Sequence, residues 1–346
     1  MRLYGPSIGY ASFAVVTRGF KQALSTLGIL DGMIPVDAYD EWSGYPGALA
    51  KSAILCGPPD FLWWLMRKGR HERRAFMLAP NSSWVPPQIL QTAAEQCTEI
   101  LSPSRWGVGV LRANLDALGL DTPVSYVPHG VLPGFTARTG PPCGSPFTIA
   151  HLASTGLMRK STIELVQGFL QWRMQSESRL RLVLAEESLS IMRDRISKAA
   201  GGSIPANIEI ISRLNASPEN LTRFYHSADL VCQPSRSEGF GLVPCECRVC
   251  GVPIALTNCT GHTDHVMPGD IIIEHGPDAW IDDGPRGPGQ AEAPTVSPDA
   301  ITDALEYAYV NCDEIGPECR KMAPYFASLY DWTAIVKQWA TVFEGK

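Results

Sequence analysis

The sequence has no long apolar run and no sign of a secretory leader. Its densest apolar stretch, residues 61–66, is far shorter than the ~18 residues that a membrane-spanning helix needs. The N-terminal MRLYGPSIGY contains a Gly-Pro pair and lacks the apolar core of a signal peptide. Ten cysteines in such a chain predict reduced thiols. We therefore expect a cytoplasmic protein, with peripheral association at a membrane surface as the alternative.

Positive charge is also scarce. The formal net charge of -6 argues against a surface built throughout for nucleic acid. One basic cluster is the exception, and it could meet the phosphates of a lipid, a nucleic acid or an acidic polysaccharide. The alternative is a solvated helix end with its loop. The cluster consists of Arg67, Lys68, Arg70, Arg73 and Arg74.

The dinucleotide-binding pattern G-x-G-x-x-G is missing from the loop that follows the first expected strand, residues 5–12. Its absence counts against an NAD-dependent enzyme. Gly5 and Gly9 in this loop still allow the backbone to approach a ligand closely.

What the sequence does contain is an alternation of short β-rich runs with helical stretches such as residues 13–27 and 105–118. Continuously apolar strands between helices indicate parallel sheets covered on both faces. This predicts the α/β class with two doubly wound, Rossmann-like domains. The expected strands are residues 2–4, 52–56, 75–78, 98–101, 124–127, 147–152, 180–185, 208–211, 230–233, 254–257 and 271–274.

A length of 346 residues suits two domains of ordinary size. Residues 133–146 are rich in Gly, Pro and Thr and predict the linker. We therefore expect a first domain over residues 1–135 and a second over residues 146–329. Residues 277–298, rich in Gly and Pro, predict a long irregular loop.

Two carboxylates, Glu238 and Glu246, flank a run with two glycines and a proline. Gly allows unusual backbone angles and Pro suits a first helical position, so we expect a loop that carries Glu238. A helix would then begin near Pro244, with Glu246 in its first turn. The free N–H groups at such a helix end bind phosphate, and carboxylates accept hydrogen bonds from hydroxyls. A ligand with both groups, such as a nucleotide sugar, fits this pattern.

A second basic motif follows the expected strand 147–152. Ser161 and Glu164 have the spacing of a capping box at the start of a helix. Arg159 and Lys160 therefore precede a helix N-terminus, where their charge and the helix dipole would attract a diphosphate. The alternative is an ordinary surface helix.

The run SEGFGLVPCE, followed by GVP, resembles the Glu-x7-Glu signature of retaining GT-B glycosyltransferases, specifically the family 4 group. The resemblance implies two Rossmann-like domains that face each other across a cleft. It implies that Glu238 lies by the donor sugar and acts in catalysis, and that Glu246 holds the ribose hydroxyls. It also implies backbone contacts to sugar and diphosphate from Gly239, Phe240, Gly241 and Leu242.

The resemblance extends beyond this run. It implies that Lys160, with Arg159 second, holds the donor diphosphate, although the usual Arg six residues before the Lys is Ser154 and the usual Gly after it is Ser161. It implies that the backbone of Arg213 and Leu214 recognises the base. It implies that residues 330–346 form a helix packed on the first domain. The loop residues Gly9, Tyr10 and Ser12 would then serve the acceptor side.

Six Cys and His side chains between Cys245 and His265 support a rival zinc site, since Cys247-x2-Cys250 has finger-like spacing. A closed tetrahedral site would dismantle the expected strand and helix, so we favour buried thiols. The Asp-x-Asp motif of metal-dependent GT-A glycosyltransferases is absent, which favours handling of the diphosphate without a metal or cofactor.

The motifs and the resemblance together predict a metal-independent glycosyltransferase that moves a sugar from a UDP- or GDP-linked donor to a hydroxyl acceptor, and the resemblance implies that transfer proceeds with retention. The acceptor would be a saccharide or a lipid precursor. Three alternatives stay open: transfer to a hydroxymethylated base in DNA, nucleotide-sugar epimerisation, and non-catalytic binding of a nucleotide sugar.

Overall fold

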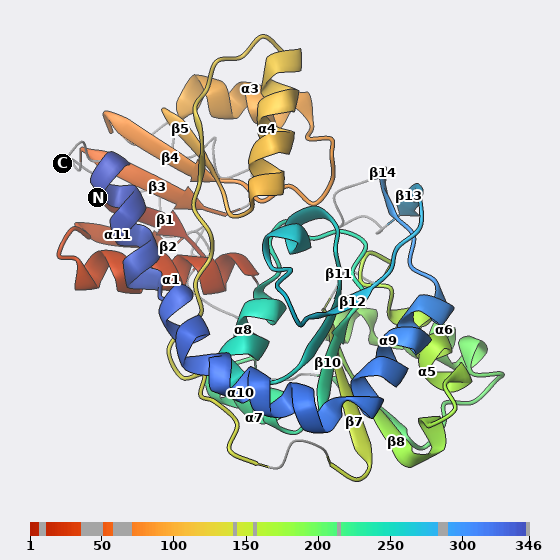
Figure 1. Cartoon of the computed structure of the whole chain (residues 1–346). Coiled ribbons are helices and arrows are strands. Elements are labelled where there is room, and N and C mark those ends of the chain that lie inside the picture. The colour runs from red at the N-terminus through yellow and green to blue at the C-terminus, as the bar shows by residue number, and fades with distance from the viewer. Residues whose placement is uncertain are drawn as a thin grey trace. The chain divides into compact units, whose positions relative to one another are not determined.

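The computed structural model describes residues 1–6, 12–35, 51–57, 71–140, 144–154, 158–212, 216–282 and 290–343. The chain divides into two compact units, one of Met1–Leu132 with Leu329–Lys346 and one of Pro133–Ser328. Each unit contains a six-stranded parallel sheet with helices on its faces (Figure 1). The predicted class of two doubly wound parallel sheets is confirmed.

The sheet of the first unit is covered by different helices on its two faces. On one face, Phe20 of α1 packs between Trp332 and Trp339 of α11, with ring centroids 5.2 and 6.0 Å away. On the other face, α3 and α4 bury Leu90 and Leu111. The sheet order is β2 (Gly32–Pro35), β1 (Arg2–Gly5), β3 (Ser52–Cys56), β4 (Arg73–Met77), β5 (Glu99–Ser102) and β6 (Val124–Tyr126). The helices are α1 (Ser12–Thr26), α3 (Pro87–Gln96), α4 (Arg105–Ala117) and α11 (Trp332–Phe343).

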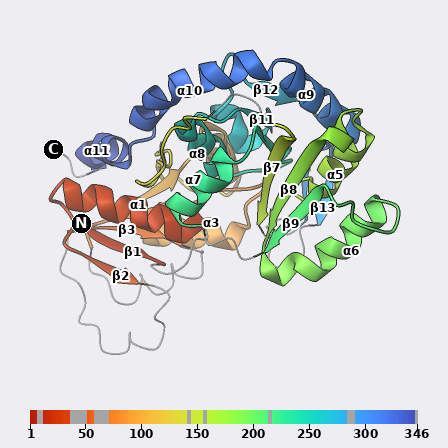
Figure 2. The same ribbon diagram turned by 90° about the horizontal axis from the view of Figure 1, so that it is seen from below.

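The second unit has the same layered construction. Helices α5, α6 and α9 cover one face of its sheet, and α7 and α8 cover the other (Figure 2). The sheet order is β12 (Ile271–Ile273), β11 (Ile254–Thr257), β10 (Leu230–Gln233), β7 (Phe147–Ser154), β8 (Ser178–Leu184) and β9 (Ile208–Ser212). The helices are α5 (Thr162–Gln171), α6 (Leu189–Ala199), α7 (Pro218–His226), α8 (Leu242–Cys250), α9 (Pro298–Val310) and α10 (Cys312–Leu329), with short 3-10 turns at Gln175–Glu177, Glu186–Ser188 and Thr260–Asp264.

The strand order of the second unit places a topological switch point between β7 and β10. From β7 the chain builds outward through β8 and β9, then returns to the opposite side of β7 and builds through β10, β11 and β12. In open α/β sheets, ligands bind beyond the carboxyl ends of the strands at such a point. The loops after β7 and β10 are therefore where a ligand site is expected, and they carry Lys160 and Glu238.

Four local expectations were wrong. The stretch 277–298 contains an antiparallel hairpin, β13 (Asp278–Asp282) and β14 (Gln290–Pro294), rather than only irregular loop. Strand β2 was not expected. Helix α8 begins at Leu242, two residues before Pro244, so Glu246 lies beyond its first turn. Ser161 does not cap α5: its backbone is left-handed (φ 48°) and its side chain makes no capping hydrogen bond.

Eight cysteines of the described residues are free thiols, seven of them buried. Cys312, at the start of α10, is disulfide-bonded, so the expectation of uniformly reduced thiols was wrong at this position. Within the described ranges, no helix is both long and apolar enough to cross a membrane.

Candidate functional site at the β7–β10 switch point

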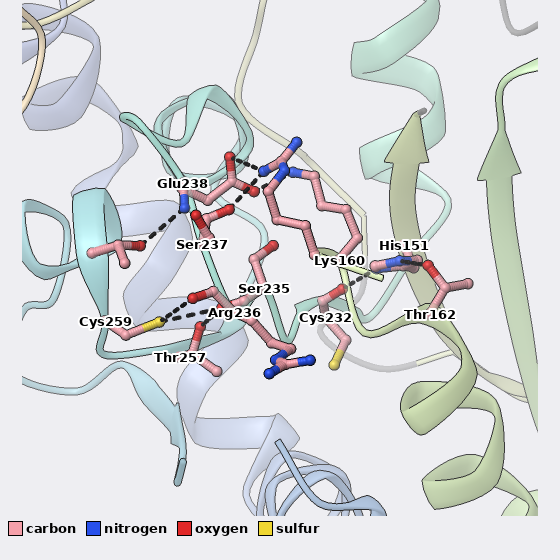
Figure 3. Close-up of polar contacts among 12 residues, drawn as sticks. His151, Lys160, Thr162, Cys232, Ser235, Arg236, Ser237, Glu238, Thr257 and Cys259 are labelled. Carbon is pink, nitrogen blue, oxygen red and sulfur yellow. Dashed lines mark hydrogen bonds and ion pairs between the residues drawn. The ribbon is translucent and has the colours of Figure 1, made fainter. Parts of the chain in front are cut away.

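The loops after β7 and β10 are joined by ion pairs at Glu238. Lys160 Nζ contacts Oε1 of Glu238 (Figure 3). Arg159 Nη1 lies 3.0 Å from Oε2 of the same carboxylate. The same Arg159 nitrogen donates to the carbonyl of Ser237 at 2.6 Å. The backbone N–H of Arg236 donates to the carbonyl of Arg159 at 2.8 Å. Side chain and backbone thus hold the two loops together across 78 residues of sequence.

The two cations determine the protonation state of Glu238. This residue is only 8% exposed. Burial alone would raise the pKa of its carboxyl. The charges of Arg159 and Lys160 outweigh burial and hold that pKa well below its usual range. Glu238 is therefore a carboxylate at neutral pH, with two cations beside it.

The backbone around Glu238 is fixed by the loop after β11. The Glu238 N–H donates to Thr260 Oγ1 at 2.9 Å, and the Gly261 N–H donates to the Glu238 carbonyl at 2.8 Å. A Cβ on Gly261 would lie 2.6 Å from that carbonyl oxygen, so only glycine fits there. Cys259 Sγ donates to the carbonyls of Ser235 and Arg236 at 3.3 and 3.4 Å. This thiol therefore braces the loop.

The start of α8 is shaped by close packing against two buried histidines. Gly241 has a φ of 102°, and a Cβ there would lie 2.7 Å from the ring of His262. The rings of Phe240 and His265 meet edge to face, with centroids 4.5 Å apart. Burial lowers the pKa of His262 to about 4 and holds the pKa of His265 well below its usual value, so both rings are neutral near pH 7. Leu242 then opens the helix, whose first N–H groups have no partner within a helix.

Glu246 sits in a different environment from Glu238. It is 7% exposed, and its Oε2 accepts a hydrogen bond from the hydroxyl of Tyr225 in α7 at 2.6 Å. Burial raises the pKa of the Glu246 carboxyl to about 7, while the Tyr225 hydroxyl lowers it somewhat. The charge of Glu246 therefore changes close to neutral pH, whereas that of Glu238 does not.

Sequence reasoning missed His151, which links three elements at the switch point. Its Nδ1 lies 2.8 Å from the carbonyl of Cys232 in β10, and its Nε2 lies 3.0 Å from Thr162 Oγ1 in α5 (Figure 3). A carbonyl can only accept, so Nδ1 donates and Nε2 accepts. Burial lowers the pKa of His151 to about 4, so the ring stays neutral. The one histidine of a mostly apolar strand was the available signal.

Arg236 was also missed, although it adjoins Glu238. This residue is 7% exposed, and its side chain donates to three backbone carbonyls of the β13–β14 hairpin, those of Pro294, Ala293 and Ala279, at 2.6, 3.1 and 3.1 Å. The hairpin is thereby tied to the loop that carries Glu238.

Several predicted site residues lie outside the described residues: Gly9, Tyr10, Arg213, Leu214, Arg67, Lys68 and Arg70. Ser12 is the first residue of α1 and Ser154 the last of β7, but their side chains are not described. Of the basic cluster, Arg73 donates to the backbone carbonyl of Phe343, and Arg74 exchanges backbone hydrogen bonds with the hydroxyl of Thr98. The described part of the chain contains no group of three or more side chains arranged to hold a metal ion.

Comparison with known proteins points to the same segment. Residues 160–283 match the family model described as "Glycosyl transferases group 1", a stretch that includes Lys160, Glu238 and Glu246. A D-inositol 3-phosphate glycosyltransferase of Mycolicibacterium gilvum is 39% identical over 67 residues, which is 18% of this chain and 15% of that protein. One from Mycobacterium marinum is 31% identical over 121 residues, 33% of this chain and 25% of that protein. The matches thus span a quarter or less of these relatives.

Solved structures match over the whole chain. Sucrose-phosphate synthase from Thermosynechococcus elongatus is similar with a TM-score of 0.69 at 14% identity, covering 99% of this chain and 98% of the other. Anabaena HepE, solved with UDP and glucose, is similar with a TM-score of 0.70 at 10% identity, covering 100% and 99%. The chain has the GT-B fold. At these identities the likeness concerns the fold.

Proposed function

We propose that this protein is a glycosyltransferase that moves a sugar from a nucleotide-diphosphate donor to a hydroxyl acceptor. The observation that carries the proposal is the cluster of Arg159, Lys160 and Glu238 at the β7–β10 switch point. Its cations suit a diphosphate, and the carboxylate suits the hydroxyls of a sugar. The match of residues 160–283 to a glycosyltransferase family model supports it.

In this proposal the donor diphosphate binds against Lys160, Arg159 and the N-terminus of α8. The carboxylate of Glu238 pairs with both cations when no ligand is bound, so an incoming diphosphate competes with it for their positive charge. Glu246, one helix turn further into α8, accepts the ribose hydroxyls. The preformed charges stabilise the negative charge that builds on the departing diphosphate.

The reaction we propose proceeds with retention and without a resident metal or cofactor. The bond from the anomeric carbon to the diphosphate oxygen breaks, and the acceptor oxygen bonds to that carbon on the same face. The acceptor's proton passes to the departing diphosphate. The donor is UDP- or GDP-linked, and the acceptor is a saccharide or lipid precursor. A cytoplasmic location is part of the proposal, and cell fractionation tests it.

The first test is a thermal-shift series with UDP, GDP and their sugars. A ligand that binds only the folded state raises the melting temperature with its concentration. We expect one nucleotide series to stabilise the wild type, Lys160→Ala to lose most of that shift, and Lys198→Ala to keep it. Lys198 is a matched control because it is an exposed lysine on α6, paired with Asp194. If no nucleotide or sugar nucleotide shifts the wild type, the donor-site proposal fails.

The second test is turnover of the stabilising donor with saccharide and lipid acceptors, in the presence and absence of EDTA. We expect a product whose anomeric configuration, read by proton NMR, matches the donor, with EDTA having no effect. An inverted product contradicts retention. Conversion of the donor to an altered free sugar nucleotide without an acceptor indicates an epimerase. Binding of the donor without any turnover indicates a binding protein.

A further inference from the structure

The hydroxyl of Tyr225 and the carboxylate of Glu246 form a buried pair between α7 and α8. Tyr225 is fully buried, its ring stacks on Phe135 of the preceding linker at 6.3 Å, and its hydroxyl lies 2.6 Å from Glu246 Oε2. Among the described residues, Tyr225 is the one hydrogen-bond partner of this carboxylate. An ionised carboxylate has about four acceptor sites, so Oε1 remains for a ligand.

We propose that Tyr225 is a positioning residue for the donor. Its hydroxyl holds Glu246 in place and favours the ionised form, so that the carboxylate recognises the 2′,3′-diol of a ribose. The inference rests on the proposed function, and it adds a residue outside the Glu-x7-Glu motif together with a pH dependence of the donor site.

The surroundings of Glu246 leave Tyr225 as the group that favours its charged form. Burial, the charge of Glu246 and the neighbouring thiol of Cys247 raise the pKa of Tyr225 well above its usual value, so the phenol keeps its proton and always donates. Burial also raises the pKa values of Cys247 and Cys250, two of the thiols on α8, and both stay neutral. Arg248 is engaged elsewhere, 2.5 Å from Asp270. The linker contributes the uncharged ring of Phe135.

Loss of the hydroxyl would therefore act through Glu246. Without that donor the buried carboxylate is harder to ionise, and the Glu246 pKa rises further above 7. A protonated Glu246 has lost its negative charge and accepts weakly from ribose hydroxyls. Recognition of the diol should then fail at neutral pH and return as the pH is raised.

The experiment compares UDP and GDP with their 2′,3′-dideoxy analogues by calorimetry, from about pH 6 to about pH 9. Wild type should prefer the ribonucleotide about tenfold at alkaline pH, which is the size expected for a hydrogen bond to a charged group. This preference should fall as the pH drops through about 7. Tyr225→Phe should lose it at neutral pH and recover it only at higher pH. Binding of the dideoxy analogue should not change.

The outcomes separate the possible roles. If Tyr225→Phe weakens the binding of UDP and of its dideoxy analogue equally, the residue is merely structural and the inference is overturned. The inference is also overturned if Tyr225→Phe keeps the full preference for the ribonucleotide at neutral pH. Should Tyr225→Phe not fold, wild type and Glu246→Gln still decide: the preference must depend on pH in the first and not in the second, and a pH-independent wild type overturns the inference. Failure of the wild type to bind either nucleotide contradicts the proposed function instead.

Discussion

Glu238 and Glu246 lie eight residues apart and are almost equally buried, yet their surroundings treat the negative charge in opposite ways. Glu238 ends between two cations brought from the loop after β7, and its pKa falls. Glu246 lies inside α8 against a phenol, and burial raises its pKa to about 7. Burial therefore does not decide the charge of a carboxyl by itself. The neighbours decide it.

This difference suggests a division of tasks within the proposed donor site. Glu238 is permanently charged and shares its cations with any incoming anion. The pKa of Glu246 lies near 7, so the charge of this carboxyl depends on the groups that donate hydrogen bonds to it. Substitutions that remove each charge without changing side-chain shape can test the comparison directly.

The largest effect is expected for Glu238→Gln. This variant removes the carboxylate that pairs with the buried Lys160 and the half-buried Arg159, so the free energy of unfolding should fall by about 3–5 kcal/mol. Turnover should fall about 100-fold or more, because a preorganised charge at the reacting sugar is lost. Stabilisation by UDP should increase, because the diphosphate no longer competes with a carboxylate for the two cations.

Chemical denaturation with and without UDP, together with steady-state kinetics, provides the readout. Glu246→Gln is the matched control, because it removes a carboxylate that faces no cation of the described residues. Full turnover by Glu238→Gln, or the same loss of stability in both variants, would contradict the assignment of the two environments.

A smaller effect is expected for Gly261→Ala, which disturbs the Glu238 backbone and leaves the Tyr225–Glu246 pair intact. Its Cβ would lie 2.6 Å from the Glu238 carbonyl, so the loop must shift, at a cost of about 1–3 kcal/mol in the free energy of unfolding. Gly109→Ala is the control: Gly109 lies in α4, a methyl group there would meet open space, and alanine should stabilise the protein by about 0.5–1 kcal/mol. Urea unfolding measures both changes. If the free energy of unfolding changes in the same direction in both variants, the prediction is contradicted.

The smallest effect is a pH dependence of stability. The folded-state pKa of Glu246 is raised above 4.5 to about 7, so its contribution to stability is full below about pH 4.5 and is lost as the pH rises through 7. Glu246→Gln, which never ionises, should therefore match the wild type near pH 5 and exceed it by a few degrees in melting temperature near pH 8.

For Glu238 the contribution to stability changes with pH in the opposite direction. Its folded-state pKa is depressed, so its contribution is present above the unfolded value of about 4.5 and is lost as the pH falls. The deficit of Glu238→Gln should thus shrink on acidification. If the melting temperatures of the two variants change with pH in parallel, the predicted difference between the two carboxylates is contradicted.

Much of the fold follows from local sequence. The strands of both sheets are short apolar runs between helices, and parallel pairing explains why residues such as 230–233 and 254–257 are apolar on both sides. Strand β2 escaped notice because GMIP contains both Gly and Pro. The hairpin β13–β14 escaped because its partner is the Arg236 side chain, more than 40 residues earlier in the chain. The supposed cap at Ser161 failed because its left-handed backbone prevents capping geometry.

By itself the sequence determined the parallel α/β class and the spacing that places Glu238 in a loop and Glu246 in the following helix. Propensity, apolar periodicity and the Gly and Pro positions act over a few residues, so they can be read locally. Only the tertiary structure brought Lys160 onto Glu238 across 78 residues and Tyr225 onto Glu246 across 21. The opposite pKa shifts of the two carboxyls depend on those distances and on burial, because electrostatic energy is set by neighbours in space.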